Sequence, residues 1–181
     1  GSIVRVGGWG HLIGDEGSGY ALGREAIAAV VQQIDGYGEN TVLKEFLDKR
    51  LGLSSREDII RYVYGGDKHR VAAIAPLVED AAAQEDAKAM QILHDQAERL
   101  AWMVRAVVQQ TGLKEGELAL MGGGLEQGIL YRREAVAAIE KSLPGICCIA
   151  PRQTAAEGAV RMAEELLEEK GFIECKKESD T

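Results

Sequence analysis

A glycine-rich stretch near the N-terminus, GGWGHLIGDEGSGY at residues 7–20, has the residue types of a small-molecule binding loop. It holds six glycines, two adjacent carboxylates, a histidine and a tryptophan, and it has neither a helical nor a strand period. Glycine loses much conformational entropy on folding, but it lets a backbone approach a ligand closely. A carboxylate such as Asp15 could accept hydrogen bonds from a polyhydroxylated ligand. Trp9 could stack on a sugar or nucleobase, or simply anchor a hairpin, and His11 alone is interpreted as structural.

A second glycine cluster follows an apolar run in LALMGGGLEQG at residues 118–128. An apolar strand there would end in three glycines, with a helix shortly after. In open α/β sheets ligands bind beyond the carboxyl ends of the strands, so this turn is well placed for a ligand. The pattern matches neither a Walker A loop nor G-x-G-x-x-G. The residues alone do not distinguish two interpretations of this turn, a tight packing corner and a ligand site.

Composition and charge limit the classes of partner. The net charge is −8, the isoelectric point is near 5.0 and no basic stripe is present, so we expect no nucleic-acid binding. Three cysteines without framework spacing argue against a secreted disulfide scaffold. The adjacent Cys147 and Cys148 are predicted to be buried strand residues, because the second pair that a metal or cluster site needs is missing. No apolar run reaches transmembrane length and no secretory signal pattern is present, so we expect a cytoplasmic protein with no membrane partner.

The apolar pattern predicts the elements that would hold the two glycine clusters. The strongest helix prediction covers residues 85–112, where Ala89, Leu93 and Leu100 belong to one apolar stripe. Further helices are expected at residues 23–36, 41–52, 54–66, 68–86, 129–145 and 154–171, and strands at 3–6, 117–124 and 146–151. Pro76 should kink the helix at 68–86 or mark the first turn of a new one. The alternation in the second half predicts a short parallel strand pair, crossed by the 129–145 helix and covered by the 85–112 helix.

Four segments, in order, resemble the N-acetylglucosamine kinase and BadF/BadG-type ATPase family of the actin, sugar kinase and Hsp70 superfamily. They are GGWGHLIGDEGSGYALGREA, RVAAIAPLVEDAAAQEDAKAMQIL, LALMGGGLEQG and IAPRQTAAEGAVRMA. The resemblance extends to about Ala163. It implies an α/β fold: one helix-rich, ribonuclease H-like lobe of the actin-like ATPase fold with a small, partly parallel sheet. That lobe would comprise residues 1–172, followed by a polar tail at 173–181.

The resemblance also implies which residues bind ligands in a cleft between two lobes. The residues implied to contact the acceptor sugar are Gly8, Trp9, Gly10 and Asp15. Those implied to lie against the adenosine of ATP are Gly122, Gly123, Gly124, Ala155 and Gly158. No catalytic residue and no metal ligand is assigned to this chain.

The sequence also departs from the family pattern. The Asp-Gly-Gly-Gly-Thr phosphate loop and the aspartate general base of the family's N-terminal lobe have no counterpart here. The chain therefore resembles the C-terminal lobe of an ATP- and Mg²⁺-dependent kinase that converts N-acetylglucosamine to its 6-phosphate, inactive on its own. Its expected partners are the sugar, the nucleotide and the missing N-terminal lobe, and a homodimer stays open. The alternatives are a lobe of an ATPase that activates a partner enzyme, and a non-catalytic helical interaction module. In the wider family, the branch of Fe–S activator proteins uses cysteines at a lobe interface. Cys147 and Cys148 do not match that placement, which favours the kinase branch.

Overall fold

The computed structural model describes residues 3–169 of the 181. The chain divides into two compact units, at residues 1–149 and 150–181, which are described separately below. The predicted tail at 173–181 and Cys175 lie outside the described residues.

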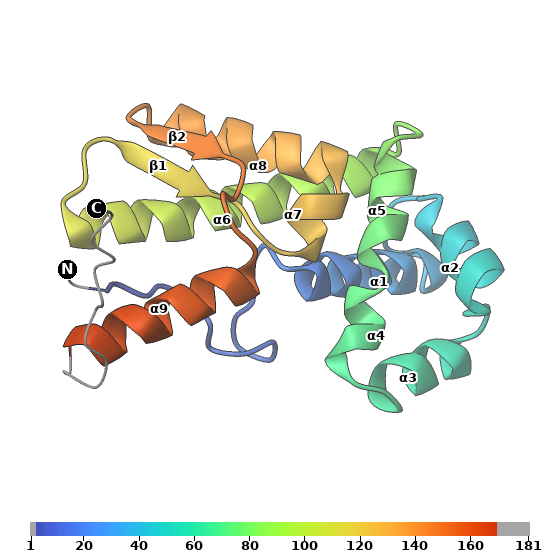
Figure 1. Cartoon of the computed structure of the whole chain (residues 1–181). Coiled ribbons are helices and arrows are strands. Elements are labelled where there is room, and N and C mark those ends of the chain that lie inside the picture. Colours follow the sequence, from blue (N-terminus) through green and yellow to red (C-terminus); the bar gives the residue numbers. More distant parts are fainter. Residues whose placement is uncertain (1–2, 170–181) are drawn as a thin grey trace. The chain divides into compact units, whose positions relative to one another are not determined.

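The first unit is helix-rich and carries one small sheet (Figure 1). Its helices are α1 (Gly19–Ile34), α2 (Leu43–Leu51), α3 (Arg56–Tyr64), α4 (Lys68–Ala72), α5 (Ala75–Ala82), α6 (Ala87–Thr111), α7 (Gly123–Gln127) and α8 (Ile129–Ser142), and its strands are β1 (Gly116–Ala119) and β2 (Ile146–Ile149). The helix predictions are confirmed to within a few residues. Helix α7 was not predicted: the strand expected at 117–124 ends at Ala119, and Gly123 and Gly124 begin α7. Pro76 lies in the first turn of α5, so the segment predicted at 68–86 is two helices.

Side-chain caps fix where several helices begin. The side chain of Ser18 accepts a hydrogen bond from the Ala21 amide at the start of α1. Ser55 and Asp58 form a reciprocal capping box on α3. Asp86 caps α6, and Gly112 ends that helix in the left-handed conformation.

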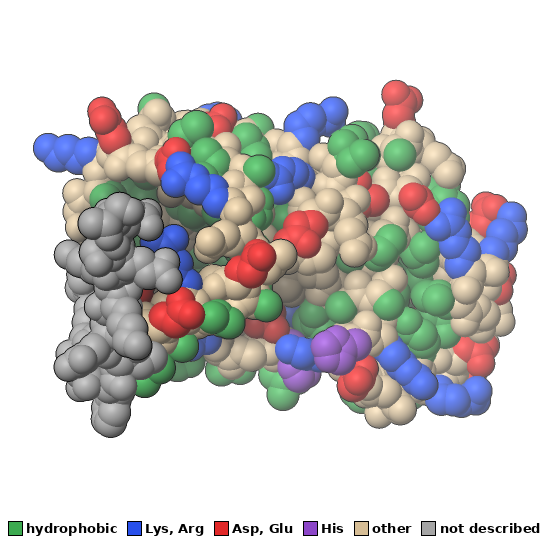
Figure 2. Space-filling model, in the orientation of Figure 1, with side chains coloured by type: hydrophobic (Ala, Val, Ile, Leu, Met, Phe, Trp, Pro, Cys, Tyr) green, Lys and Arg blue, Asp and Glu red, His purple; other side chains and the backbone are tan. Residues whose placement is uncertain are grey.

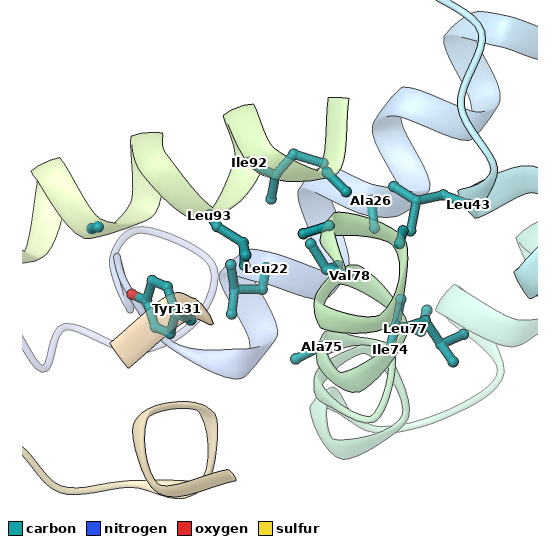
Figure 3. Close-up of a cluster of buried hydrophobic side chains, with 14 of the residues drawn as sticks. Leu22, Ala26, Leu43, Ile74, Ala75, Leu77, Val78, Ile92, Leu93 and Tyr131 are labelled. Carbon is teal, nitrogen blue, oxygen red and sulfur yellow. The ribbon is translucent and has the colours of Figure 1, made fainter. Parts of the chain in front are cut away.

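The core lies where α1, α5, α6 and α8 pack on one another. Figure 3 shows part of it, with Leu22 from α1, Val78 from α5 and Leu93 from α6. Among the buried residues of this unit, Tyr131 is the largest fully buried side chain and Gln96 is a buried amide in the otherwise apolar face of α6. These two polar side chains lie on the side of the core that faces the first glycine-rich loop.

The sheet confirms the predicted parallel pair. β1 and β2 pair in parallel with Gly116 opposite Ile146 and Ala119 opposite Ile149, and α8 is the crossover helix between them (Figure 1). Helix α8 packs on β2, whereas α6 packs mainly on α8, so the 85–112 helix supports the sheet through α8.

Two predictions about strands are wrong. Residues 3–6 form no strand in the part of the chain that the structure describes, because a strand needs a ladder partner for its amides and carbonyls and none lies beside them. The segment at 146–149 is a strand but is not fully buried: Cys147 is exposed and Cys148 half-buried. The reason is that the two-stranded sheet leaves part of β2 open. Partial burial raises the pKa of the Cys148 thiol, which disfavours its reactive thiolate.

The second unit contains α9 (Ala155–Glu169). Thr154 and Glu157 form a capping box at its start: the Thr154 amide donates to Glu157 Oε2 at 2.8 Å, and the Glu157 amide donates to Thr154 Oγ1 at 3.3 Å. The helix prediction at 154–171 is confirmed over the described residues.

Candidate functional site

The glycine turn after β1 has a backbone that only glycine adopts easily. Gly122 has φ 113° and ψ 149° and lies just before the first residue of α7. Its carbonyl accepts hydrogen bonds from the amides of Leu125 and Glu126, and its own amide donates to Glu126 Oε1 at 3.0 Å. The turn is therefore held by its own helix, and the backbone of the next two residues stays accessible.

A pocket of about 420 Å³ opens beside this turn. It is lined by Gly123, Gly124, Gln127 and Gly128 from the α7 segment, by Gly19 and Leu22 from α1, and by Ala72, Ala73, Ala75, Pro76, Glu79 and Asp80 from α4, α5 and their junction. Its volume is within the roughly 300–1,000 Å³ usual for small-molecule sites. Small side chains dominate the lining, so a ligand would meet backbone over much of its surface. The sequence prediction of a ligand-accessible turn therefore coincides with a real cavity.

The two glycine clusters meet at this pocket. A Cβ atom built on Gly124 would lie 3.8 Å from the backbone nitrogen of Gly19. Gly19 is the first residue of α1 and closes the loop that begins at Gly7. The fold therefore brings together segments that are about a hundred residues apart in the sequence.

The first glycine-rich loop is built from left-handed residues. Gly7, Gly8, Gly10 and Gly17 all have positive φ, and so does Asp15 with φ 64°. A non-glycine residue in this conformation is uncommon and marks a constrained turn. The Asp15 carbonyl accepts a hydrogen bond from the Ser18 amide at 3.1 Å. Asp15 thus occupies a fixed backbone position just before α1.

The side chains predicted to contact sugar are accessible from this loop. Trp9 is 76% exposed and anchors no hairpin in the described chain, which removes one of the two interpretations given to it. Asp15 is half-exposed. His11 packs edge-on against the ring of Tyr20, with 4.9 Å between ring centroids, as expected for a structural histidine. The loop thus leaves the Trp9 ring and the Asp15 carboxylate accessible.

Electrostatics favour a neutral group in the pocket over a phosphate. Glu79 and Asp80 both line it, and carboxylates repel phosphate oxygens. Asp80 forms an ion pair with Arg50, and the Glu79 carboxylate accepts hydrogen bonds from the amides of Leu130 and Tyr131 at 3.1 and 2.7 Å. A nucleoside, with an apolar face and hydroxyl donors, suits this lining better than a triphosphate does.

Two predicted site residues lie elsewhere in the chain. Ala155 and Gly158 belong to α9 in the second unit, so their proximity to the pocket stays a prediction. Conversely, the sequence prediction missed Ala72, Ala75 and Glu79, which line the pocket from helices. Two signals pointed to this region without assigning these residues a role: Pro76, which marks a helix junction, and the family resemblance of the segment that begins at Arg70.

Other kinds of site are not supported by the described residues. Within residues 3–169, no group of three or more His, Cys, Asp or Glu side chains is placed to hold a metal ion. No helix in the same range is long and apolar enough to cross a membrane. Figure 2 shows acidic and basic side chains interspersed over the visible face.

Comparisons with known proteins identify the relatives of this fold and pocket. The BadF/BadG/BcrA/BcrD ATPase family matches residues 1–163. An N-acetylmuramic acid/N-acetylglucosamine kinase of Clostridium acetobutylicum is 35% identical over 167 residues, covering 90% of this chain and 55% of the relative. An N-acetyl-D-glucosamine kinase of Dictyostelium discoideum is 35% identical over 133 residues, covering 70% of this chain and 42% of the relative.

A solved structure agrees with these matches. It is that of a protein from Chromobacterium violaceum assigned as an N-acetylglucosamine kinase, and it superposes with a TM-score of 0.70 at 28% identity, over 86% of this chain and 50% of that one. The chain spans about half the length of the relatives that it matches. The family resemblance carried by the four sequence segments is confirmed.

Proposed function

The chain belongs to the BadF/BadG/BcrA/BcrD ATPase family, and on that premise we propose that it is the C-terminal lobe of an ATP-dependent amino-sugar kinase. The substrate class is N-acetylglucosamine or a close relative, and the lobe is a ribonuclease H-like unit of the actin-like ATPase fold. The observation that carries the proposal is the meeting of the two glycine clusters at one pocket, with Gly124 beside Gly19.

The pocket beside the turn at Gly122–Gly124 is proposed to hold the adenosine of ATP. Added methyl groups at Gly123 would meet no protein atom within 4 Å, so the space above this residue is free for a flat ring or a ribose. The carboxylates of Glu79 and Asp80 would keep the phosphates outside, directed toward the other side of the cleft.

The loop at 7–18 is proposed to form one wall of the sugar site. Asp15 would accept hydrogen bonds from sugar hydroxyls, and Trp9 would offer an apolar face to the ring. Gly8 and Gly10 would allow the backbone to approach the sugar.

Phosphoryl transfer needs more than this chain provides. It depends on positioning, on a base for the acceptor hydroxyl, on donors that hold the β- and γ-phosphates, and on a magnesium ion, which would neutralise phosphate charge. The residues at 3–169 do not fit a magnesium site, since no cluster of ligands is present among them. The resemblance assigns the base and the Asp-Gly-Gly-Gly-Thr phosphate loop to an N-terminal lobe. We therefore propose that this lobe binds parts of both substrates and does not turn them over alone.

The first test is binding by the chain itself. In a ¹⁵N-labelled sample, ATP should shift the amides of residues 122–128, and N-acetylglucosamine should shift those of residues 7–17. The affinity for ATP should be millimolar at best, because half of a cleft leaves much of the binding cost uncompensated. Micromolar ATP affinity would mean that the pocket is complete within this chain, and shifts confined to other residues would refute the assignment.

The second test is activity. The purified chain with ATP, magnesium and N-acetylglucosamine should give no sugar phosphate, and addition of a separately expressed N-terminal lobe of a relative should restore turnover. Robust turnover by the chain alone, abolished by Asp15→Ala, would show that the base lies in this sequence. ATP hydrolysis by the assembled lobes that does not depend on sugar would favour the partner-activating ATPase instead.

A further inference from the structure

The peptide units around Gly17 are held by two buried side chains from distant helices. The Gly17 amide donates to Gln96 Oε1 at 3.0 Å, and the Gly17 carbonyl accepts a hydrogen bond from the Tyr131 hydroxyl at 2.7 Å. Gln96 on α6 is 2% exposed, and Tyr131 on α8 is fully buried. Both polar groups of one loop residue are therefore fixed by the core.

The packing around Gly17 leaves no freedom of position. A Cβ atom at this residue would lie 3.0 Å from the Tyr131 hydroxyl and 3.2 Å from Leu100 Cβ, and the residue has φ 74°. Gly17 thus lies in a slot between α6 and α8 that admits only glycine. Because Asp15 is two residues away and its carbonyl is bonded to Ser18, the slot also sets the position of Asp15.

Gln96 has no other evident use in its helix. It lies among Leu93, Ala97 and further apolar residues on the buried face of α6, where an amide is costly unless its hydrogen bonds are made. An apolar side chain of similar size would pack there at lower cost. The amide is explained by its bond to the loop.

Tyr131 is itself anchored to the pocket. Its backbone amide donates to Glu79 Oε1 at 2.7 Å, and Glu79 lines the pocket together with Gly128. A Cβ atom at Gly128 would lie 2.6 Å from the same Glu79 oxygen, so the absence of a side chain here leaves room for the carboxylate. Two hydrogen bonds, joined through the side chain of Tyr131, therefore connect Glu79 at the pocket with Gly17 in the loop.

We propose that Gln96 and Tyr131 are positioning residues for the loop that carries Asp15, and that Tyr131 with Glu79 ties this loop to the nucleotide pocket. The assignment of the loop to sugar and of the pocket to nucleotide rests on the function proposed above. The anchoring of the loop itself does not, so the two can fail separately.

The direct test is amide hydrogen exchange in the ligand-free chain. Tyr131→Phe removes one hydroxyl and keeps the ring, and Gln96→Met removes the amide at similar volume. Each should accelerate exchange at Gly17 and Ser18 roughly ten- to a hundredfold, as expected for loss of a buried hydrogen bond. Their effects on amides of α2 should be small.

A control removes another hydrogen bond from a tyrosine hydroxyl to a backbone carbonyl, at an exposed position. The Tyr62 hydroxyl donates to the Arg70 carbonyl, also at 2.7 Å, away from the loop. Tyr62→Phe should leave exchange at Gly17 and Ser18 unchanged. Unchanged exchange at these two amides in both Tyr131→Phe and Gln96→Met would overturn the proposal. If one of the two variants does not fold, the other still decides.

Ligand-binding measurements on the same variants separate a positioning role from an effect on general stability. With N-acetylglucosamine as the probe, Tyr131→Phe should weaken binding at least fivefold relative to the wild type, and Tyr62→Phe should not. With ATP as the probe, the Gly17 amide should shift in the wild type and shift less in Tyr131→Phe. If the wild type binds neither probe while exchange responds as predicted, the proposed function fails and the anchoring stands. If exchange responds but sugar affinity is unchanged in Tyr131→Phe, the positioning role is refuted.

Discussion

Gly123→Ala separates the stability of the lobe from its binding of nucleotide. Gly123 is the first residue of α7, its φ is not positive, and a Cβ atom there meets no protein atom within 4 Å. The added methyl group therefore strains neither the backbone nor the packing. It does occupy space in the pocket where the proposed nucleoside would lie.

Gly123→Ala should increase the stability of the lobe and decrease its affinity for nucleotide. Replacing glycine by alanine at a compatible position stabilises a protein by about 0.4–1 kcal/mol, chiefly by restricting the unfolded chain. For a chain of this length 1 kcal/mol raises Tm by roughly 2–4 °C. Crowding the ligand with one methyl group should cost about 1–3 kcal/mol, which is a roughly five- to 150-fold loss of affinity.

Thermal unfolding followed by circular dichroism and ATP titration followed by NMR measure the two effects. Gly116→Ala is the matched control, because Gly116 lies in β1, also lacks a positive φ, and would bring its Cβ no closer than 4.0 Å to Ile146. It should leave ATP affinity unchanged. An affinity of Gly123→Ala within twofold of the wild type would show that the nucleoside does not lie against this turn.

Three further predictions concern residues that hold the fold. Asp86→Ala removes the α6 cap and two hydrogen bonds to the 41–42 segment, so the free energy of unfolding in urea should fall by about 2–4 kcal/mol; Asp86→Asn should lose less, and equal losses would contradict the hydrogen-bond explanation. Gly17→Ala should cost about 2–4 kcal/mol in the same assay, from the left-handed backbone and the crowded slot, and a loss below about 1 kcal/mol would show that the slot is loose. Burial raises the pKa of Tyr131, so its contribution to stability is fully present below the unfolded pKa of about 10 and is lost as pH rises above it, by about 1.4 kcal/mol per pH unit. Between pH 10 and 11 the slope of the free energy of unfolding against pH should be smaller in Tyr131→Phe by roughly three quarters of a proton, because the unfolded tyrosine is only half ionised at pH 10. An unchanged slope would contradict this.

The elements of the fold were largely predictable because their signals are local. An apolar stripe and a terminal glycine predict α6 to within about two residues at each end. The alternation of helix and strand predicts the parallel pair, because a crossover helix of this length returns the chain in the same direction. The segment at 3–6 shows the limit: its β-branched alternation is a propensity, and a strand also needs a partner.

The site was predictable only in part, because its supporting residues depend on tertiary contacts. The glycine clusters were visible as composition, and the resemblance gave them roles. Gln96 and Tyr131 were not visible, since they bond to Gly17 across 79 and 114 residues of sequence and each resembles an ordinary helix residue. Glu79 likewise resembles a solvated helix carboxylate, yet both of its oxygens hold the start of α8.

The glycines of the two clusters divide by what the protein itself requires. Gly17 and Gly122 have positive φ, and Gly128 would place a Cβ 2.6 Å from its neighbours, so the fold alone explains these three. Gly123 and Gly19 have neither a positive φ nor a neighbour closer than 3.6 Å to an added Cβ, and Gly124 is also free of both constraints. Gly19, Gly123 and Gly124, which the fold does not require, line one pocket. Gly14 also lacks a positive φ, and the nearest atoms to an added Cβ lie at 3.4 Å, but it does not line this pocket. Alanine would give both helices better intrinsic propensity at the three pocket positions, so the preference for glycine there is explained by a ligand that approaches the backbone, and this is why a single methyl group at Gly123 is the sharpest test of the proposed nucleotide site.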